Sequence, residues 1–268
     1  MVGQAFESRA RLATMPYLFA TERHDFSDLA GGAVLHAIPG QPALPVRLAD
    51  EVFQRCLAAR RGSGPADPLC LYDPCCGGGY QLTVLGLMHG REVNRIVGSD
   101  IQPALVRAAR RNLDLVSREG LDRRIAELEQ HARDYQRPSY ALAAASARRL
   151  RDALARDLGD RILDTDVFEA DALDPDRVAG RLGPASVDIA LADVPYGRHS
   201  VWQGRELSEI ADGDWIGRLL ESLRGVLRPG GVVGIVSDKG QKALHPAYKR
   251  LERFQIGKRR VAILRLGE

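Results

Sequence analysis

The chain has 268 residues, of which 45% are hydrophobic and 27% charged, so it can bury the core of one large domain. No run approaches the length of about eighteen apolar residues that a membrane-spanning helix needs. The opening MVGQAFESRARLATMPYLFA lacks the basic head and long apolar stretch of a signal peptide. We therefore expect one globular domain over residues 1–268, located in the cytoplasm and without a membrane partner. Its net charge is only +3, but the charge is unevenly distributed along the chain.

The N-terminal segment, residues 1–45, contains a possible strand at 33–37 that is followed by the turn Pro39-Gly40. We expect this segment to lean over a pocket. A short apolar run at 69–72 then ends at three glycines, and residues 81–88 follow with helical spacing. This order predicts a strand, a turn and a helix.

A second strand is predicted at 96–99, where Asp100 closes it, and Pro103 suits the first turn of the next helix. Residues 104–160 are too long for one crossover helix and read as a helical insertion, with helices at about 103–117, 120–136 and 139–158. Its twelve arginines and nine acids favour an ion-paired, exposed helical face over an RNA-binding platform.

The later strand candidates are 166–168, 187–191, 232–236 and 261–264, with a helix at 214–227 that stops at Arg-Pro-Gly-Gly. Strands that alternate with helices predict an α/β fold with a mostly parallel sheet covered on both faces. Ligands of such sheets bind beyond the carboxyl ends of the strands. We expect a Rossmann-like sheet with the helical insertion after the second strand.

The four cysteines, Cys56, Cys70, Cys75 and Cys76, lack the C-x-x-C spacing of a zinc site. Two of them are adjacent, which strains any disulfide between them. We therefore expect buried, reduced thiols and no metal site.

The glycine turn Cys-Cys-Gly-Gly-Gly at 75–79 is not a phosphate loop, because no lysine and hydroxyl pair follows it. It also departs from the dinucleotide fingerprint, since Leu82 stands where the last glycine belongs. What remains is a turn that lets a ligand approach the backbone closely.

Three aspartates follow three successive strands, and each could bind a different part of one ligand. Asp73 suits an ammonium group, Asp100 can accept hydrogen bonds from both ribose hydroxyls, and Asp171 can accept one from an adenine amino group. Any one of them could instead cap a helix. Together they describe S-adenosylmethionine, and we assign the following residues to that cofactor: Asp73, Cys75, Gly77, Gly79, Asp100, Ile101, Asp171, Ala172 and Asp193.

The stretch Asp193-Val-Pro-Tyr-Gly197 ends the strand at 187–191 and is similar to the [DNS]-P-P-[YFW] motif of methyltransferases that modify nitrogens of bases. Such a loop surrounds the edge of an extruded base and stacks an aromatic ring on its face. We assign Asp193 to the Watson–Crick edge and to proton acceptance. Pro195 shapes the loop, and Tyr196 stacks on the base.

Several stretches resemble the avilamycin-resistance 23S rRNA methyltransferases of the AviRa family. They include DLAGGAVLH at 28–36, PVRLA at 45–49, DPCCGGGYQLTVLGL at 73–87, DVPYG at 193–197 and LERFQIGKR at 251–259. The resemblance implies the class I methyltransferase fold, a Rossmann-like, mostly parallel sheet of seven strands with helices on both faces. It also implies methylation of a guanine in 23S rRNA, with N1 as the target atom. It also implies resistance to orthosomycins such as avilamycin and everninomicin. A longer N-terminus and the loop after Gly197 depart from the family pattern.

The basic C-terminal segment, residues 239–268, holds nine Lys or Arg residues against Glu252 and Glu268, a net charge of +7. The rest of the chain therefore sums to +3 minus +7, or −4. Such a face suits a polyanion, although a solvated surface without a partner has the same composition. We assign to 23S rRNA the phosphate contacts Lys249, Arg250, Lys258, Arg259 and Arg260, and stacking by Trp202.

Other functions stay open from the residues alone. Methylation of guanine N2 or adenine N6, or of a protein glutamine or a small molecule, could use the same loop, although the charge of the C-terminal segment argues against a substrate other than RNA. A non-catalytic RNA-binding module would lack cofactor affinity, which the set Asp73, Gly77 and Asp100 argues against. A nicotinamide dehydrogenase is disfavoured by Leu82 and by the Asp193 loop.

Overall fold

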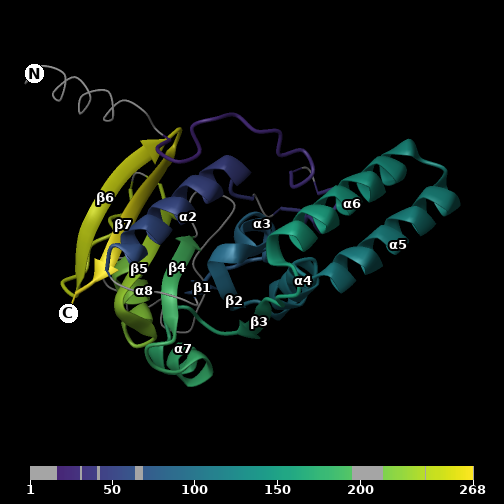
Figure 1. The fold of residues 1–268 in the computed structure, drawn as a ribbon. Helices are drawn as coiled ribbons and strands as arrows, with labels where there is room; N and C mark the ends of the chain where they lie inside the picture. The colour runs from purple at the N-terminus through teal and green to yellow at the C-terminus, as the bar shows by residue number, and fades with distance from the viewer. Residues whose placement is uncertain are drawn as a thin grey trace, which may run out of the picture.

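The computed structural model describes residues 17–30, 32–40, 43–63, 69–194, 214–238 and 240–267. Within these ranges seven strands form one sheet in the order β3-β2-β1-β4-β5-β7-β6 (Figure 1). The strands are β1 (Leu69–Asp73), β2 (Val93–Asp100), β3 (Asp164–Glu169), β4 (Val187–Asp193), β5 (Leu227–Ser237), β6 (Tyr248–Ile256) and β7 (Arg259–Leu266).

Helices cover both faces of the sheet. One face packs against α2 (Val46–Arg61), α3 (Tyr80–His89) and α4 (Pro103–Asp114), and the other against α7 (Pro175–Leu182) and α8 (Trp215–Arg224). A short 3-10 helix, η1 (Gly90–Glu92), precedes β2. The strands alternate between the two cores: Ile189 and Leu191 face α2, whereas Ala190 and Ala192 face α8.

The sheet is parallel except at β7, which pairs antiparallel with both β5 and β6. The chain proceeds from β1 outward to β3, then returns to β4 on the other side of β1. Side chains at the carboxyl ends of β1 and β4 therefore meet at the topological switch point, where ligands of open α/β sheets bind. The predicted fold class is confirmed.

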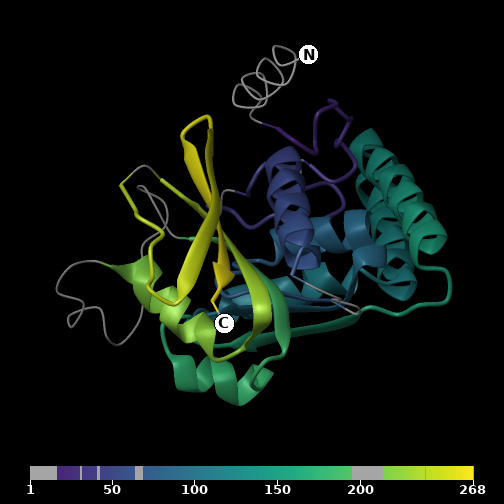
Figure 2. The same cartoon turned by 60° about the vertical axis from the view of Figure 1, so that its left-hand side comes forward.

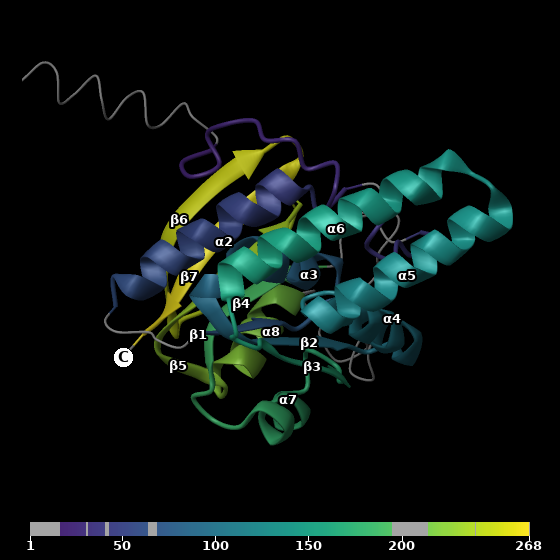
Figure 3. The ribbon, with the colours of Figure 1, turned by 45° about the vertical axis from the view of Figure 1, so that its right-hand side comes forward.

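The insertion after β2 forms a long helical hairpin, the arm, made of α5 (Arg118–Tyr135) and α6 (Pro138–Leu158). It lies at the opposite end of the molecule from the β6–β7 hairpin (Figures 1 and 3). Ion pairs link its helices, from Arg148 to Glu129 and from Arg151 to Asp122. The prediction of an ion-paired helical face is confirmed.

The strand predicted at 33–37 is wrong, because this stretch forms turns and bends. Its backbone groups bond to side chains instead of a neighbouring strand. Arg124 donates to the carbonyl oxygens of Ala33 and Val34, and Asn112 both accepts from the N–H and donates to the carbonyl of His36. The segment does lean over the glycine turn, as expected, because the side chain of Ile38 packs on Gly78.

Four elements were absent from the expectations: α2, η1, α7 and β6. Helix α2 begins after Pro45, and β6 lies in the basic segment and pairs with β7 as an edge hairpin (Figure 2). Helix α8 ends at Arg224, three residues before the predicted end. No helix among the described residues is long and apolar enough to cross a bilayer.

Candidate active site

Four of the predicted acids gather around Cys75 at the carboxyl edge of the sheet. Burial raises the pKa of the Cys75 thiol well above its usual value, and the carboxylates of Asp73, Asp100, Asp171 and Asp193 raise it further. Asp73, Asp193 and Asp100 are the last residues of β1, β4 and β2. The strand ends that were predicted to meet do meet, and they form a negatively charged site.

Asp73 lies at the centre of this site and is only 2% exposed. Burial raises the pKa of its carboxyl group well above the usual value, and the neighbouring Asp193 and Asp100 add to the effect. The N–H of Cys75, which donates to Asp73 Oδ1 at 3.0 Å, acts in the opposite direction. A buried carboxylate next to two others is a strong binding position for a cation such as an ammonium group.

Asp100 holds the glycine turn in place. Its Oδ2 accepts from the N–H of Gly77 at 3.0 Å and its Oδ1 accepts from the N–H of Gln102 at 2.9 Å. Burial nevertheless raises the pKa of Asp100. Each carboxylate oxygen has a second lone pair, so Asp100 can still accept bonds from ligand hydroxyls.

The turn itself requires glycine at position 79. Gly79 has φ = 74°, a left-handed conformation, and a Cβ there would lie 2.9 Å from Ala109 of α4. Gly77 also has a positive φ of 53°. Glycine at 78 and 79 therefore lets the turn pack directly against Ile38 of the N-terminal segment and Ala109 of α4.

The remaining predicted cofactor residues lie at the same edge. Asp171 follows β3 and is half-buried, and its Oδ1 accepts from the N–H of Leu173 at 3.0 Å. Ala172 is buried and Ile101 is half-buried. Asp171 keeps one carboxylate oxygen outside this turn for a ligand amino group.

Asp193 is fixed by the sheet itself. It pairs with Val236 of β5, and the next residue, Val194, continues the ladder by donating its N–H to the carbonyl of Val236 at 3.0 Å. The backbone of Asp193 is therefore rigid despite Val194 standing where the motif has a proline. Pro195, Tyr196 and Trp202, to which roles were assigned, lie outside the described residues.

The expectations missed Asn112, which organises this site from α4. Its fully buried amide bonds to both backbone groups of His36 and donates to the carbonyl of Gly78 at 2.7 Å. It thus joins the N-terminal segment to the glycine turn. A single asparagine inside a helical pattern carries no sequence signal for this role.

The assigned RNA-binding cations all lie on the β6–β7 hairpin. Arg260 pairs with Ser237 at the end of β5, so it reaches the same edge of the sheet as Asp193. Lys258 is exposed in the turn between the strands, and Arg259 begins β7. Lys249 and Arg250 lie toward the other end of β6 and are exposed.

The residues present fit S-adenosylmethionine. The buried carboxylate of Asp73, with Asp100 and Asp193 beside it, suits an organic cation such as an ammonium group. The described ranges hold no group of three or more potential metal ligands. Cys76 is not such a ligand, because it is buried against Gly98, where an added Cβ would lie 2.9 Å from its sulfur. All four cysteines are free.

Comparisons with known proteins agree with this geometry. The sequence model of the family described as rRNA methyltransferase AviRa matches residues 15–259. A 23S rRNA (guanine(2535)-N(1))-methyltransferase of Streptomyces viridochromogenes is 42% identical over 252 residues, which cover 94% of this chain and 96% of that protein.

Two crystal structures of the rRNA methyltransferase aviRa from Streptomyces viridochromogenes, at 1.5 Å and 2.4 Å, superpose with TM-scores of 0.82 and 0.81. Both are 39% identical to this chain, and the match covers 94% of this chain and 96% of theirs. The chain belongs to the AviRa family of rRNA methyltransferases.

Proposed function

We propose that this protein transfers the methyl group of S-adenosylmethionine to N1 of a guanine in 23S rRNA and thereby gives resistance to orthosomycin antibiotics. The observation that carries the proposal is the 42% identity, over almost the whole chain, to a 23S rRNA guanine-N1 methyltransferase. The cluster of acids at the switch point supports it independently. Because ribosomes are its target, the protein works in the cytoplasm.

Each of the site residues binds a different part of the cofactor. Asp73 pairs with the ammonium group, Asp100 accepts from the ribose hydroxyls, and Asp171 accepts from the adenine amino group. Gly77 and Gly79 hold the left-handed conformation of the turn that borders the methionine part. The neighbouring residues Cys75, Ile101 and Ala172 complete the walls, and Asp193 borders the methyl group.

When bound, S-adenosylmethionine supplies an electrophilic methyl group, so the protein's main task is to align the guanine nitrogen. Guanine N1 carries a proton at neutral pH. Asp193, held rigidly at the end of β4, would accept a hydrogen bond from N1–H and take the proton as N1 bonds to the methyl carbon and the carbon–sulfur bond breaks, which would leave the neutral thioether S-adenosylhomocysteine. Pro195 shapes the loop, and Tyr196 stacks on the extruded base.

The hairpin cations bind the phosphates of the RNA. Lys249, Arg250, Lys258 and Arg260 form no ion pair with any described residue, whereas arginines of the arm are paired with acids. Unpaired cations keep their charge available for phosphate groups. Arg259 stands beside them at the start of β7, and Trp202 is assigned to stacking on a neighbouring nucleotide.

Primer extension on 23S rRNA tests the proposal. A methyl group on N1 blocks Watson–Crick pairing, so reverse transcriptase stops at the modified base. We expect one cofactor-dependent stop at a single guanine. Ribonuclease-sensitive incorporation of labelled methyl without a stop would instead indicate guanine N2 or another non-blocking nitrogen, such as adenine N6. Incorporation that survives ribonuclease would indicate a protein glutamine.

A further inference from the structure

The β6–β7 hairpin, residues 248–266, contains a single acid among seven cations. That acid is Glu252, and the cations are Lys249, Arg250, Arg253, Lys258, Arg259, Arg260 and Arg265. A carboxylate in the middle of a phosphate-binding strand would repel the RNA. Where the strand register places Glu252 therefore matters for binding.

The pairing of β6 with β7 shifts register between Arg250 and Glu252, which leaves Leu251 as an extra residue, a β-bulge. On either side of the bulge, Arg250 lies opposite Leu264 and Arg253 lies opposite Ala262. Residues paired across an antiparallel ladder share a face, and alternate residues of β7 share one too. The bulge thus brings two arginines three positions apart onto one face.

Arg260 belongs to the same face, because it alternates with Ala262 and Leu264 along β7 and lies opposite Gln255 of β6. We call it the α8 face, because Leu264 packs with the residues of α8 and Tyr248 donates to the carbonyl of Leu220 at 2.8 Å. Arg250, Arg253 and Gln255 are exposed there. Successive positions in this row lie about 7 Å apart, the rise of two strand residues.

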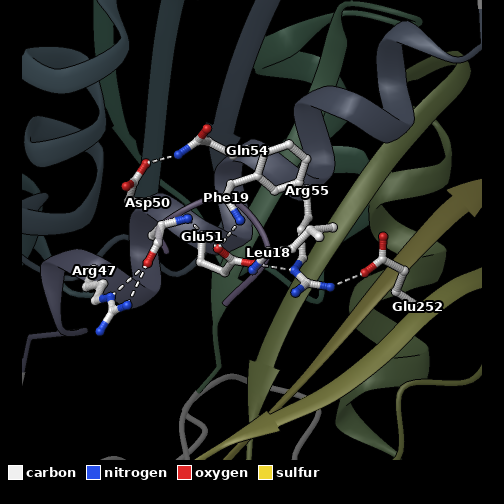
Figure 4. Close-up of polar contacts among 9 residues, drawn as sticks. Leu18, Phe19, Arg47, Asp50, Glu51, Gln54, Arg55 and Glu252 are labelled. Carbon is white, nitrogen blue, oxygen red and sulfur yellow. Dashed lines mark hydrogen bonds and ion pairs between the residues drawn. The ribbon is translucent and has the colours of Figure 1, made fainter. Parts of the chain in front are cut away.

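Glu252 lies on the opposite face, which packs on α2. It pairs with Ile263, a member of the core beneath α2, and its carboxylate contacts the Nη1 of Arg55 (Figure 4). The Arg55 guanidinium also donates from Nε to Glu51 at 2.6 Å and lies 4.1 Å from the ring centroid of Phe254. Arg55 thereby neutralises the only acid of the hairpin on the side away from the arginine row.

We infer that Arg250, Arg253 and Arg260 form the row that binds the phosphodiester backbone of the RNA substrate, and that Arg55 is a positioning residue that keeps the charge of Glu252 off that face. The row ends at Arg260, on the same sheet edge as Asp193, so RNA bound along it leads into the reaction site. None of the three arginines forms an ion pair within the described part of the chain. This inference rests on the proposed rRNA substrate and narrows its phosphate contacts, because Lys249, which pairs with Arg265, and Arg259, which alternates with Val261, lie on the α2 face and are not members of the row.

The salt dependence of binding to a 23S rRNA transcript tests the row. The substitutions R250Q, R253Q and R260Q each remove one positive charge from the α8 face. R265Q is the matched control, because Arg265 alternates onto the α2 face and donates to Ser63 Oγ. Each row substitution should flatten the plot of log affinity against log salt by about 0.7–0.9, the value of one phosphate contact. R265Q should leave the slope unchanged.

A gain-of-charge variant guards against misfolding as the explanation. Q255K places a new cation opposite Arg260 on the α8 face, and we expect it to steepen the salt slope by about the same amount. Cofactor affinity, measured by calorimetry, should stay within a few-fold of wild type in all of these variants. Unchanged slopes in the row variants, or a loss as large in R265Q, would overturn the assignment of the face.

The positioning role of Arg55 is tested by rescue. R55M should weaken RNA binding several-fold, because it leaves the Glu252 carboxylate uncompensated, and the double variant R55M/E252Q should regain the affinity. A purely structural role of Arg55 would not respond to E252Q. If the wild-type protein neither binds nor methylates 23S rRNA, the proposed function fails. If the wild-type protein binds with a steep salt slope and the row variants have the same slope, only this inference fails.

Discussion

The side-chain Nδ2 of Asn112 donates to the main-chain carbonyl of Gly78 at 2.7 Å, so it ties α4 directly to the glycine turn. The same amide bonds to the N–H and the carbonyl of His36, which anchors the N-terminal segment above the turn. These three partners of the Asn112 amide are all main-chain groups. A buried side chain therefore substitutes here for the missing partner strand.

Asn112→Ala should lower both stability and cofactor affinity. The truncation leaves the His36 N–H and the Gly78 carbonyl without their partner, and an unsatisfied buried polar group costs about 1–3 kcal/mol. Urea unfolding measures the loss, and calorimetry should show several-fold weaker binding of S-adenosylmethionine. Arg107→Ala, at an exposed position of the same helix, is the control. If Asn112→Ala bound the cofactor as tightly as wild type, the position of the glycine turn would not determine cofactor affinity.

Asp73→Asn should stabilise the cofactor-free protein at neutral pH while weakening cofactor binding. The pKa of Asp73 is raised in the fold above its ordinary value of 3.8, so the protonated form is favoured there. Its contribution to stability is fully present below 3.8 and is lost as pH rises through the raised value. At neutral pH Asp73 is ionised in the unfolded chain, so folding must either protonate it or bury its charge, and asparagine avoids both costs.

Two measurements check the Asp73 prediction. Unfolding free energy at pH 7.5 should rise in Asp73→Asn, and its dependence on pH above 4 should flatten. Affinity for S-adenosylmethionine should fall at least about tenfold, because the ammonium group loses its ion pair. Asp134→Asn, which changes an exposed acid of the arm, should do neither. A destabilised Asp73→Asn variant with normal affinity would mark Asp73 as a structural acid.

Asp193→Ala should abolish methyl transfer while cofactor affinity stays within a few-fold of wild type. Removing a positioned general base typically costs about 10²–10⁴ in rate. Single-turnover incorporation of labelled methyl into 23S rRNA measures the chemical step, and calorimetry measures cofactor binding separately. Transfer at the wild-type rate would remove Asp193 from the mechanism.

His36 should make the protein less stable as pH falls below neutrality. Burial lowers its pKa from 6.5 to about 4, and the nearby Arg124 and Arg111 lower it further. Because this pKa is lowered in the fold, the contribution of neutral His36 to the free energy of unfolding is fully present above pH 6.5 and is lost as the pH falls through about 4. His36→Gln should therefore show a flatter profile of unfolding free energy between pH 7 and pH 4.5. Parallel profiles for the two proteins would contradict this account.

Glu51→Ala should release the first described segment of the chain. The Glu51 carboxylate, whose side chain is 0% exposed, accepts from the N–H groups of Leu18, Phe19 and Ala20 at 2.6–2.9 Å (Figure 4). Burial raises the pKa of Glu51, but these donors and Arg55 lower it more, so that it lies below its ordinary value.

Removing this acceptor leaves three N–H groups and part of Arg55 uncompensated, a loss of about 3–5 kcal/mol by analogy with broken buried ion pairs. Urea unfolding measures it, and limited proteolysis should cut between residues 17 and 24. Gln54→Ala is the control, because Gln54 lies one turn of α2 away and its side chain donates to Asp50. Resistance to the protease equal to wild type would show that other contacts hold the segment.

Much of the active site could be predicted because its signals are local. Asp73, Asp100 and Asp193 each end a strand, and parallel strands bring their carboxyl ends to one edge. Short stretches of the sequence likewise predict the glycine turn and the three helices after β2. Knowing the order of the elements was enough to place the acids together.

Only the tertiary structure decided what depends on partners far away in the chain. The stretch 33–37 has the composition of a strand, yet its backbone bonds to side chains far away in the sequence. His36 bonds to Asn112, 76 residues away, and Ala33 bonds to Arg124, 91 residues away. The basic segment has no clean alternation, because the bulge at Leu251 interrupts it, and only pairing with β7 makes it a strand. Composition along the chain determined which charges are present; the register of β6 decided which face each charge occupies, because one extra residue reverses the alternation of side chains.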